Sequence, residues 1–219
     1  MGRAVGVLGG AFNPPHVGHM VLAQEAIWSL GLDELVLVPT GRAPHKVIAP
    51  EPGPEVRLEL AEAAARGVDR VRVSALEVER EGPSYAYRTL ELLEDELPGS
   101  DFTFVMGADV AASLESWRRP ERVLELARVA VAGRPGIDVG AVSAALERLG
   151  ADEGARTLQM PEIEVSSTLV RERVAAGKPV RWLVPDAVAE LIRERGLYRD
   201  EAGAEAPAGV KIESEGAGA

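Results

Sequence analysis

The stretch AVGVLGGAFNPPHVGH, residues 4–19, sets the expected fold. Its first five residues, Ala4–Leu8, form a short unbroken apolar run, which predicts a buried strand. Two glycines end this run, and apolar residues with helical spacing follow over His19–Leu30, with Gly31 directly after them. A buried strand that turns through glycines into a helix is typical of an α/β protein with a parallel sheet.

The same alternation of strand and helix patterns continues along the chain. Further strands are expected at Glu34–Pro39, Val71–Val78, Phe102–Met106, Arg128–Ala132 and Thr157–Met160. Helices are expected at Pro54–Arg66, from a cap at Ser84 to Leu97, and at Pro120–Ala127, Val139–Leu149, Ser166–Ala176 and Pro185–Arg195. We predict a single Rossmann-like domain, a doubly wound, mostly parallel sheet with helices on both faces. Ligands of such sheets bind at the carboxyl ends of the strands, so the loops after Leu8, Pro39 and Met106 are candidates.

Charge and composition exclude several classes of protein. The 219 residues include 24 Lys+Arg and 35 Asp+Glu, for a formal net charge of −11, and no cysteine. Without cysteine, a disulfide framework, a thiol nucleophile and a zinc ribbon are impossible. The acidic balance argues against a nucleic-acid coat or a binder of anionic membranes. No apolar run approaches a membrane span and no signal peptide is evident, so we expect a cytoplasmic protein.

The last 20 residues differ from the rest in composition. Residues 200–219 hold five acids and one lysine, and half of them are Ala or Gly. Such a segment buries too little apolar surface to offset its ordering entropy. We therefore predict a folded domain over residues 1–199 and a disordered acidic tail over residues 200–219.

The loop after the first strand carries two of the three histidines. Gly9 and Gly10 let the backbone come close to a phosphate, while His16 and His19 share a face at the positive end of a helix. This pattern suits a triphosphate. The same spacing also fits a metal site or a structural pair, although zinc would want a further ligand and His45 is the only other histidine. Spacing alone leaves the three interpretations open.

Two further blocks follow other strands. Ser166, Ser167, Thr168 and Arg171 mark a helix start whose hydroxyls and guanidinium suit phosphate oxygens. Taken alone, the block is more often an ordinary capped helix with a surface arginine. After the fourth strand, Gly107 permits close approach and Asp109 is placed to accept a ribose hydroxyl. Trp117 follows eight residues later, and an isolated Trp is more often a packing residue.

The string G-G-x-F-[ND]-P-x-H-x-G-H over residues 9–19 resembles the signature of the H-x-G-H nucleotidyltransferase superfamily, and in full that of bacterial nicotinate-mononucleotide adenylyltransferases. The S-S-T-x-x-R block and the pattern G-x-D-x-x-x-x-L-x-x-W, from Gly107 to Trp117, are similar to motifs of the same family. The resemblance covers nearly all of residues 4–199. It implies transfer of AMP from ATP to nicotinate mononucleotide, giving deamido-NAD and pyrophosphate in NAD biosynthesis.

The resemblance also implies roles for individual residues. The catalytic set it implies is His16, His19, Lys46 and Arg171. ATP would be bound by Gly9, Gly10, Phe12, Ser167, Thr168 and Arg171. The nicotinate nucleotide would be bound by Lys46, Tyr85, Ala86, Gly107, Asp109, Trp117 and Arg134, with Trp117 stacked on the nicotinate ring. In the segment that follows Ser84, two residues depart from the family pattern: Ala86 replaces a Thr that lies against the nicotinate carboxylate, and Arg88 replaces an Asp. Backbone N–H groups at this place could still bind the carboxylate.

The expected reaction is a direct in-line attack, because the acceptor phosphate is already anionic and no cysteine is present. Mg²⁺ is expected as a cofactor held mainly by the ATP phosphates with waters, and not in a dedicated protein cage. Structural zinc is not expected, since Lys46 beside His45 would repel a cation at that point. The expected partners are ATP and nicotinate mononucleotide, without nucleic acid or membrane, and a homo-oligomer is possible. The alternatives are transfer to nicotinamide mononucleotide or another phosphate acceptor, and a non-catalytic nucleotide sensor.

Overall fold

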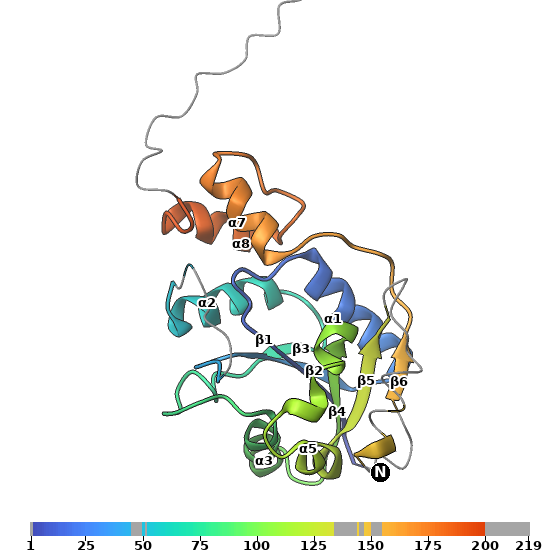
Figure 1. The fold of residues 1–219 in the computed structure, drawn as a ribbon. Coiled ribbons are helices and arrows are strands. Elements are labelled where there is room, and N and C mark those ends of the chain that lie inside the picture. Colours follow the sequence, from blue (N-terminus) through green and yellow to red (C-terminus); the bar gives the residue numbers. More distant parts are fainter. Residues whose placement is uncertain are drawn as a thin grey trace, which may run out of the picture.

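The structure is a computed structural model that describes residues 2–44, 50, 52–133, 144, 147–149 and 155–199. Its strands are β1 (Ala4–Gly10), β2 (Glu34–Pro39), β3 (Val71–Val73), β4 (Asp101–Gly107), β5 (Arg128–Ala132) and β6 (Ala155–Leu158) (Figure 1). Its helices are α1 (Val17–Leu30), α2 (Pro54–Ala65), α3 (Ala86–Glu96), α4 (Ala108–Ala111), η1 (Leu114–Ser116), α5 (Pro120–Leu126), α7 (Ser167–Ala175) and α8 (Asp186–Glu194).

The six strands form one sheet in the order β3-β2-β1-β4-β5-β6, and all of its pairings are parallel. Val7 of β1 pairs with Val36 of β2 on one side and with Phe104 of β4 on the other. This is the strand order of the dinucleotide-binding Rossmann fold. Strands β1 to β3 are added toward one edge of the sheet and β4 to β6 toward the other, so the order of addition reverses between β1 and β4. The predicted doubly wound parallel sheet is therefore confirmed, with a switch point at the loop after β1.

Helices cover both faces of the sheet. Helices α1 and α2 lie on one face, whereas α3 and α5 lie on the other, below the sheet in Figure 1. The side chains of β2 alternate accordingly: Leu35 and Leu37 join the core under α1 and α2, and Val36 and Val38 join the core over α3 and α5. Because both faces are buried, β2 is apolar at nearly every position.

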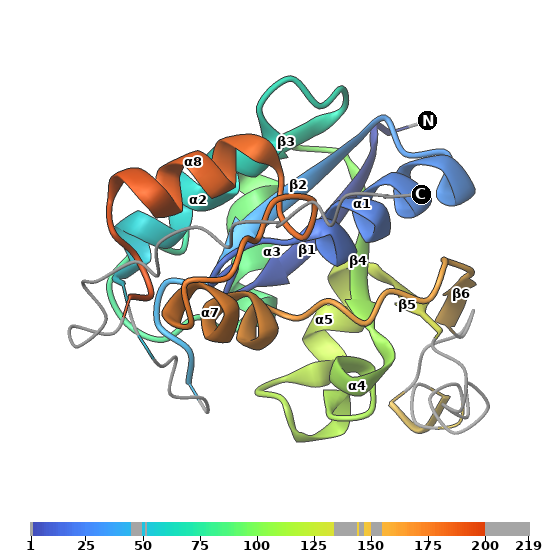
Figure 2. The ribbon, with the colours of Figure 1, turned by 90° about the horizontal axis from the view of Figure 1, so that it is seen from above.

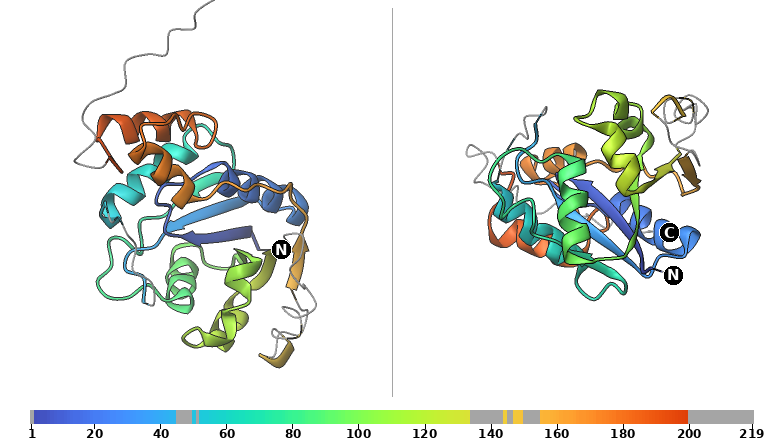
Figure 3. Two further views of the ribbon diagram at one scale, coloured as in Figure 1. Left: turned by 45° about the horizontal axis from the view of Figure 1, so that its top comes forward. Right: turned by 90° about the horizontal axis from the view of Figure 1, so that it is seen from below.

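The C-terminal helices form a further layer. Helix α8 runs alongside α2 (Figure 2), and α7 lies with α8 on the face of the sheet that α2 covers (Figure 3). Leu60 of α2, Val170 of α7 and Val188 of α8 are fully buried in a third apolar cluster between these helices. The chain thus returns from β6, at the far edge of the sheet, to the loop that follows β1. None of the described helices has the length and apolar character needed to cross a membrane.

Two sequence predictions about the region after β2 were wrong. The strand predicted over Val71–Val78 ends at Val73, because the chain turns at residues 75–79, where the amide of Val78 donates to the carbonyl of Ala75. Ser84 does not cap α3, whose N-cap is Tyr85. Its hydroxyl instead accepts from the amides of Gly41 and Arg42 at 3.1 and 3.2 Å. Both differences come from the β2–α2 loop docking on this segment.

The other predicted elements shift by a few residues at their ends. Helix α1 begins at Val17 rather than His19, and the short elements α4 and η1 were not predicted. Most of the helix predicted over Val139–Leu149, and the tail predicted over residues 200–219, lie outside the described residues.

Candidate active site

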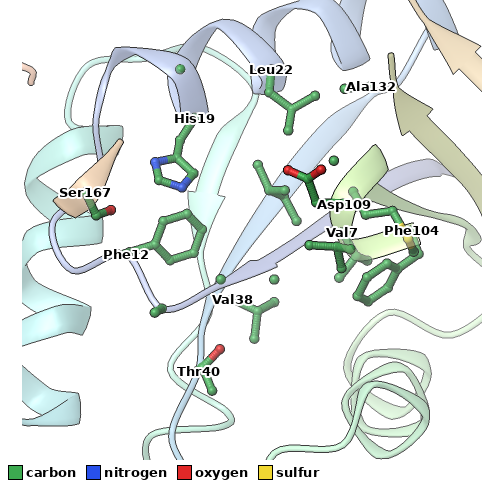
Figure 4. Close-up of a pocket in the computed structure, with 18 of the residues that line it drawn as sticks. Val7, Phe12, His19, Leu22, Val38, Thr40, Phe104, Asp109, Ala132 and Ser167 are labelled. Atoms are coloured by element: carbon green, nitrogen blue, oxygen red, sulfur yellow. The ribbon is translucent and has the colours of Figure 1, made fainter. Parts of the chain in front are cut away.

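A cavity of about 660 Å³ opens at the carboxyl ends of the strands, beside the switch point (Figure 4). The ends of four neighbouring strands contribute to its wall: Gly9 and Gly10 of β1, Val38 of β2, Met106 and Gly107 of β4, and Ala132 of β5. Its volume suits small-molecule ligands, and its position is the one at which doubly wound sheets bind nucleotides.

The two glycines that end β1 have different surroundings. A Cβ added to Gly10 would lie 3.3 Å from the ring of Phe12, a tight contact that the ring would have to relieve by a shift of a few tenths of an ångström. Phe12 is 1% exposed and holds a left-handed backbone conformation with φ of 48°. A Cβ on Gly9 would have only Phe104 within 4 Å, at 3.7 Å. Gly10 thus lies close beneath Phe12, whereas Gly9 leaves its backbone open toward the cavity.

His16 and His19 form a tilted pair at the start of α1, with ring centroids 3.9 Å apart. The backbone amide of His16 donates to Nδ1 of His19 at 3.2 Å, and the edge of the His19 ring meets Phe12 with 5.1 Å between centroids. Since Nδ1 accepts this hydrogen bond, a neutral His19 carries its proton on Nε2. Burial first, and the neighbouring His16 second, lower the pKa of His19 from 6.5 to about 3. The free site therefore presents a neutral imidazole that is a hydrogen-bond donor at Nε2 (Figure 4).

Gly18 and the helix start complete this end of the cavity. A Cβ on Gly18 would lie 3.0 Å from Cε1 and Nδ1 of His16, so a glycine lets the first imidazole lie flat against the helix. The first turn of α1 carries no acidic side chain. The positive end of the helix dipole is consequently left for an anionic ligand.

The C-terminal helices hold the loop between β1 and α1. The Ser167 hydroxyl donates to the carbonyl of Pro14 at 2.8 Å, and Nη1 of Arg171 donates to the carbonyl of Asn13 at 2.8 Å, on either side of the cis Asn13–Pro14 bond. The Tyr198 hydroxyl donates to Oδ1 of Asn13 at 2.6 Å. These contacts come from residues more than 150 positions away and fix the loop that leads into the histidine pair.

Aromatic and polar side chains line the other end of the cavity. Trp117 meets the ring of Phe104 edge-on, at 5.9 Å between centroids, and its Nε1 donates to the Ser113 hydroxyl at 3.1 Å. Its indole also lines the cavity, so Trp117 packs and offers a ring surface at once. Asp109, in the first turn of α4, directs its carboxylate into the same space (Figure 4).

Comparison with known proteins agrees with this site. A family model described as cytidylyltransferase-like matches residues 7–173. The chain is 38% identical to a protein of Rubrobacter xylanophilus over 90% of this chain and 93% of that protein, and 41% identical to one of Roseiflexus sp. over 89% and 98%. Each of these relatives is named "Probable nicotinate-nucleotide adenylyltransferase". This chain belongs to the nicotinate-nucleotide adenylyltransferase family.

Solved structures show the same fold. Plasmodium falciparum nicotinic acid mononucleotide adenylyltransferase, complexed with NaAD, is 17% identical with a TM-score of 0.69, over 90% of this chain and 97% of that one. The same protein complexed with APC is 16% identical with a TM-score of 0.69. The fold of the nicotinate-nucleotide adenylyltransferase family thus extends to distant relatives.

The structure brings most of the predicted site residues of this adenylyltransferase to one cavity. The residues that line it are Gly9, Gly10, Phe12, His16, His19, Tyr85, Ala86, Gly107, Asp109, Trp117 and Ser167. Thr168 and Arg171 do not line it. Nη2 of Arg171 donates to the Thr168 hydroxyl at 3.2 Å, and Nη1 of Arg171 binds the loop between β1 and α1. Lys46 and Arg134, and His45 with them, lie outside the described residues.

The sequence interpretation missed Arg57, whose side chain binds two of the loops that border the cavity. Its side chain is 0% exposed, and its guanidinium donates to the carbonyls of Ala11, Thr40 and Gly41. Arg57 thereby ties the loop after β1 to the loop after β2. The pattern PEVRLEL gave no signal for this role, because an arginine among acidic neighbours on a helix usually faces solvent.

A second residue that the sequence interpretation did not single out is Arg118, which lines the cavity together with Trp117. Its signal was its position directly after Trp117, in the run Trp-Arg-Arg.

Proposed function

We propose that this chain transfers the adenylyl group of ATP to nicotinate mononucleotide, with deamido-NAD and pyrophosphate as products. One observation carries the proposal: a single cavity joins an anion-binding end, with His16 and His19 at the start of α1, to an aromatic end at Trp117. Two nucleotides bound at these ends would meet beside the open backbone of Gly9. Membership of the nicotinate-nucleotide adenylyltransferase family supports the same reaction.

The reaction needs one bond to form and one to break. A phosphate oxygen of nicotinate mononucleotide attacks the α-phosphorus of ATP, and the bond from that phosphorus to the oxygen bridging to the β-phosphate breaks. Pyrophosphate leaves with the electron pair. The attacking oxygen is already anionic near neutral pH, so no side chain needs to remove a proton. The protein therefore acts by positioning the two phosphates and by stabilising the charge on the leaving group.

We propose particular groups for these tasks. Nε2–H of His19 donates to a phosphate oxygen, and its ring is held for this by Phe12 and by the His16 amide. The start of α1 contributes its dipole. The Ser167 hydroxyl lines the same end of the cavity. Further phosphate contacts from Lys46, Thr168 and Arg171 stay proposals that rest on the sequence motifs.

We further propose that Mg²⁺ arrives bound to the ATP phosphates and completes its shell with water. Across the described residues there is no group of three or more His, Asp or Glu side chains that could hold an ion. The neutral His19 donates through Nε2 and does not repel a nearby cation, which suits a metal carried by the substrate. When bound, Mg²⁺ would neutralise charge on the leaving pyrophosphate.

The test is an incubation with ATP, Mg²⁺ and one acceptor at a time: nicotinate mononucleotide, nicotinamide mononucleotide or a pantetheine phosphate. Pyrophosphate and the dinucleotide product are both measured. We expect the highest kcat/KM with nicotinate mononucleotide. Without Mg²⁺ we expect neither pyrophosphate nor dinucleotide to form. Binding of ATP without pyrophosphate release from any acceptor would instead identify a nucleotide sensor.

A further inference from the structure

The acceptor end of the cavity carries a cation that the proposed reaction does not yet use. Of the cavity-lining residues that the structure describes, Arg118 alone is an arginine or lysine, while Glu77, Asp109 and Glu162 contribute acidic groups. Its guanidinium carbon lies 5.4 Å from the ring centroid of Tyr85, a contact that orients the planar group over the aromatic face. The side chain remains exposed at the mouth of the cavity, where a ligand can reach it.

The neighbouring residue provides an internal comparison. The guanidinium carbon of Arg119 lies 5.3 Å from the ring centroid of Tyr87, and the rings of Tyr85 and Tyr87 are stacked with centroids 6.0 Å apart. The two arginine–tyrosine pairs are therefore nearly equivalent in geometry. They differ in their access to the site, because Arg118 and Tyr85 line the cavity and Arg119 and Tyr87 do not.

Among the described residues of the cavity wall, no other arginine or lysine is available to a carboxylate. Ala86, the residue after Tyr85, has only a methyl group and begins α3 within the cavity wall. Arg88 does not line the cavity, and its Nη1 donates to the Glu91 carboxylate at 3.1 Å on the exposed side of α3. A planar carboxylate on a ring that stacks against Trp117 would thus find Arg118 as its cationic neighbour.

We infer that Arg118 sets the acceptor specificity by pairing with the carboxylate of the nicotinate ring. This inference rests on the proposed function for the identity of the acceptor. A guanidinium donates two parallel hydrogen bonds to a carboxylate, and the two groups carry opposite charges. A carboxamide offers a single neutral oxygen and turns an N–H₂ donor toward the cation. The pair therefore favours the acid over the amide, and it takes the place of a hydroxyl at position 86.

The experiment compares wild type, Arg118→Gln and the matched control Arg119→Gln. For each protein, kcat and KM are measured with nicotinate and with nicotinamide mononucleotide at saturating ATP, and equilibrium binding of both mononucleotides is measured by calorimetry. Because the Arg118 side chain is exposed to solvent, we expect R118Q to raise the KM for the acid about tenfold, with kcat little changed. The preference for acid over amide should fall by a similar factor, and R119Q should keep the wild-type preference.

Two results would overturn the inference. One is an unchanged ratio of acid to amide binding in R118Q, and the other is an equal loss of preference in R119Q. The binding arm separates this question from the reaction itself. If wild type binds the acid better than the amide in an Arg118-dependent way but forms no dinucleotide, then the proposed function fails while the role of Arg118 stands.

Discussion

At His19, a single backbone hydrogen bond occupies Nδ1 and leaves Nε2 as the ring nitrogen that is available to a ligand. The His16 amide donates to Nδ1, so the neutral ring keeps its proton on Nε2. A donor fixed in this way costs no reorganisation when phosphate arrives, and its neutrality allows burial without a paired anion. The second histidine of the motif is thus a preorganised donor, and the proposed catalysis depends on its position.

Replacing His19 by alanine is expected to lower kcat about 100-fold or more, which is the scale found for removal of one preorganised donor. The fold should persist, since the loop is held independently by Ser167 and Arg171. Steady-state kinetics and circular dichroism of H19A measure the two effects. Near-wild-type turnover in a folded H19A protein would refute the role assigned to Nε2.

The lowered pKa of His19 also predicts how stability depends on pH. The pKa of His19 is about 3 in the folded protein and near 6.5 in the unfolded chain. Between these two pH values the unfolded state binds a proton on this imidazole and the folded state does not. Stability therefore falls as the pH drops. Relative to His19→Asn, which does not titrate, wild type should lose about 2 kcal/mol of unfolding free energy between pH 7 and pH 5. Urea unfolding at both pH values measures this, and parallel curves for the two proteins would contradict it.

Among the elements, α2 has a task that goes beyond covering the sheet. Through Arg57 it binds the carbonyls of two loops, after β1 and after β2, and both loops border the cavity. The second of these loops also docks closely on the turn after β3, where a Cβ on Gly41 would lie only 2.0 Å from the carbonyl oxygen of Glu77. The loops at the carboxyl edge are therefore fixed to one another before any ligand binds.

Substituting Arg57 by methionine is expected to cost about 3 kcal/mol of unfolding free energy, since three carbonyls would lose a buried donor. Arg173 offers a matched control, because its guanidinium donates to the carbonyl of Pro179 at the surface. R173M should cost less than about 1 kcal/mol. Urea denaturation compares the two variants, and equal losses would show that Arg57 does not brace the loops.

Seen as a whole molecule, the chain is acidic, and yet the proposed substrates are anions. The groups proposed to meet them are local: the imidazoles of His16 and His19, the start of α1 and, at the other end of the cavity, Arg118. Five of the acids lie in residues 200–219. The net charge of −11 therefore bears on nucleic acid and membranes and carries no information about small phosphates.

Local pattern was sufficient for the sheet and for the loop that carries the histidines. The alternation of buried strands with helices predicted the topology, and the string from Gly9 to His19 predicted a loop that lines the cavity. Features that depend on distant partners were not readable. Ser84 has the sequence context of a helix cap, but its hydroxyl accepts from the β2–α2 loop instead. Arg57 has the sequence context of a surface residue, because no neighbouring residue indicates that its charge is buried.

The predicted domain boundary at residue 199 gives a test at this scale. Deleting residues 200–219 is expected to leave kcat, KM and the unfolding midpoint unchanged, because the described wall of the cavity runs no further along the chain than Ser167. Tyr198, which binds Asn13, stays in the shortened protein. Kinetics and thermal unfolding of the two forms are compared, and a loss of activity or stability would assign the tail a role in the folded domain.

The central claim, direct adenylyl transfer within one cavity, is tested most directly by a single-turnover experiment. Enzyme in excess of ATP labelled at its α-phosphorus is mixed with nicotinate mononucleotide and Mg²⁺, and the reaction is quenched at short times. The account predicts that the label passes from ATP to the dinucleotide, with an equal amount of pyrophosphate and no label on the protein. Label that accumulates on the protein, appears as free AMP, or stays in ATP would contradict it.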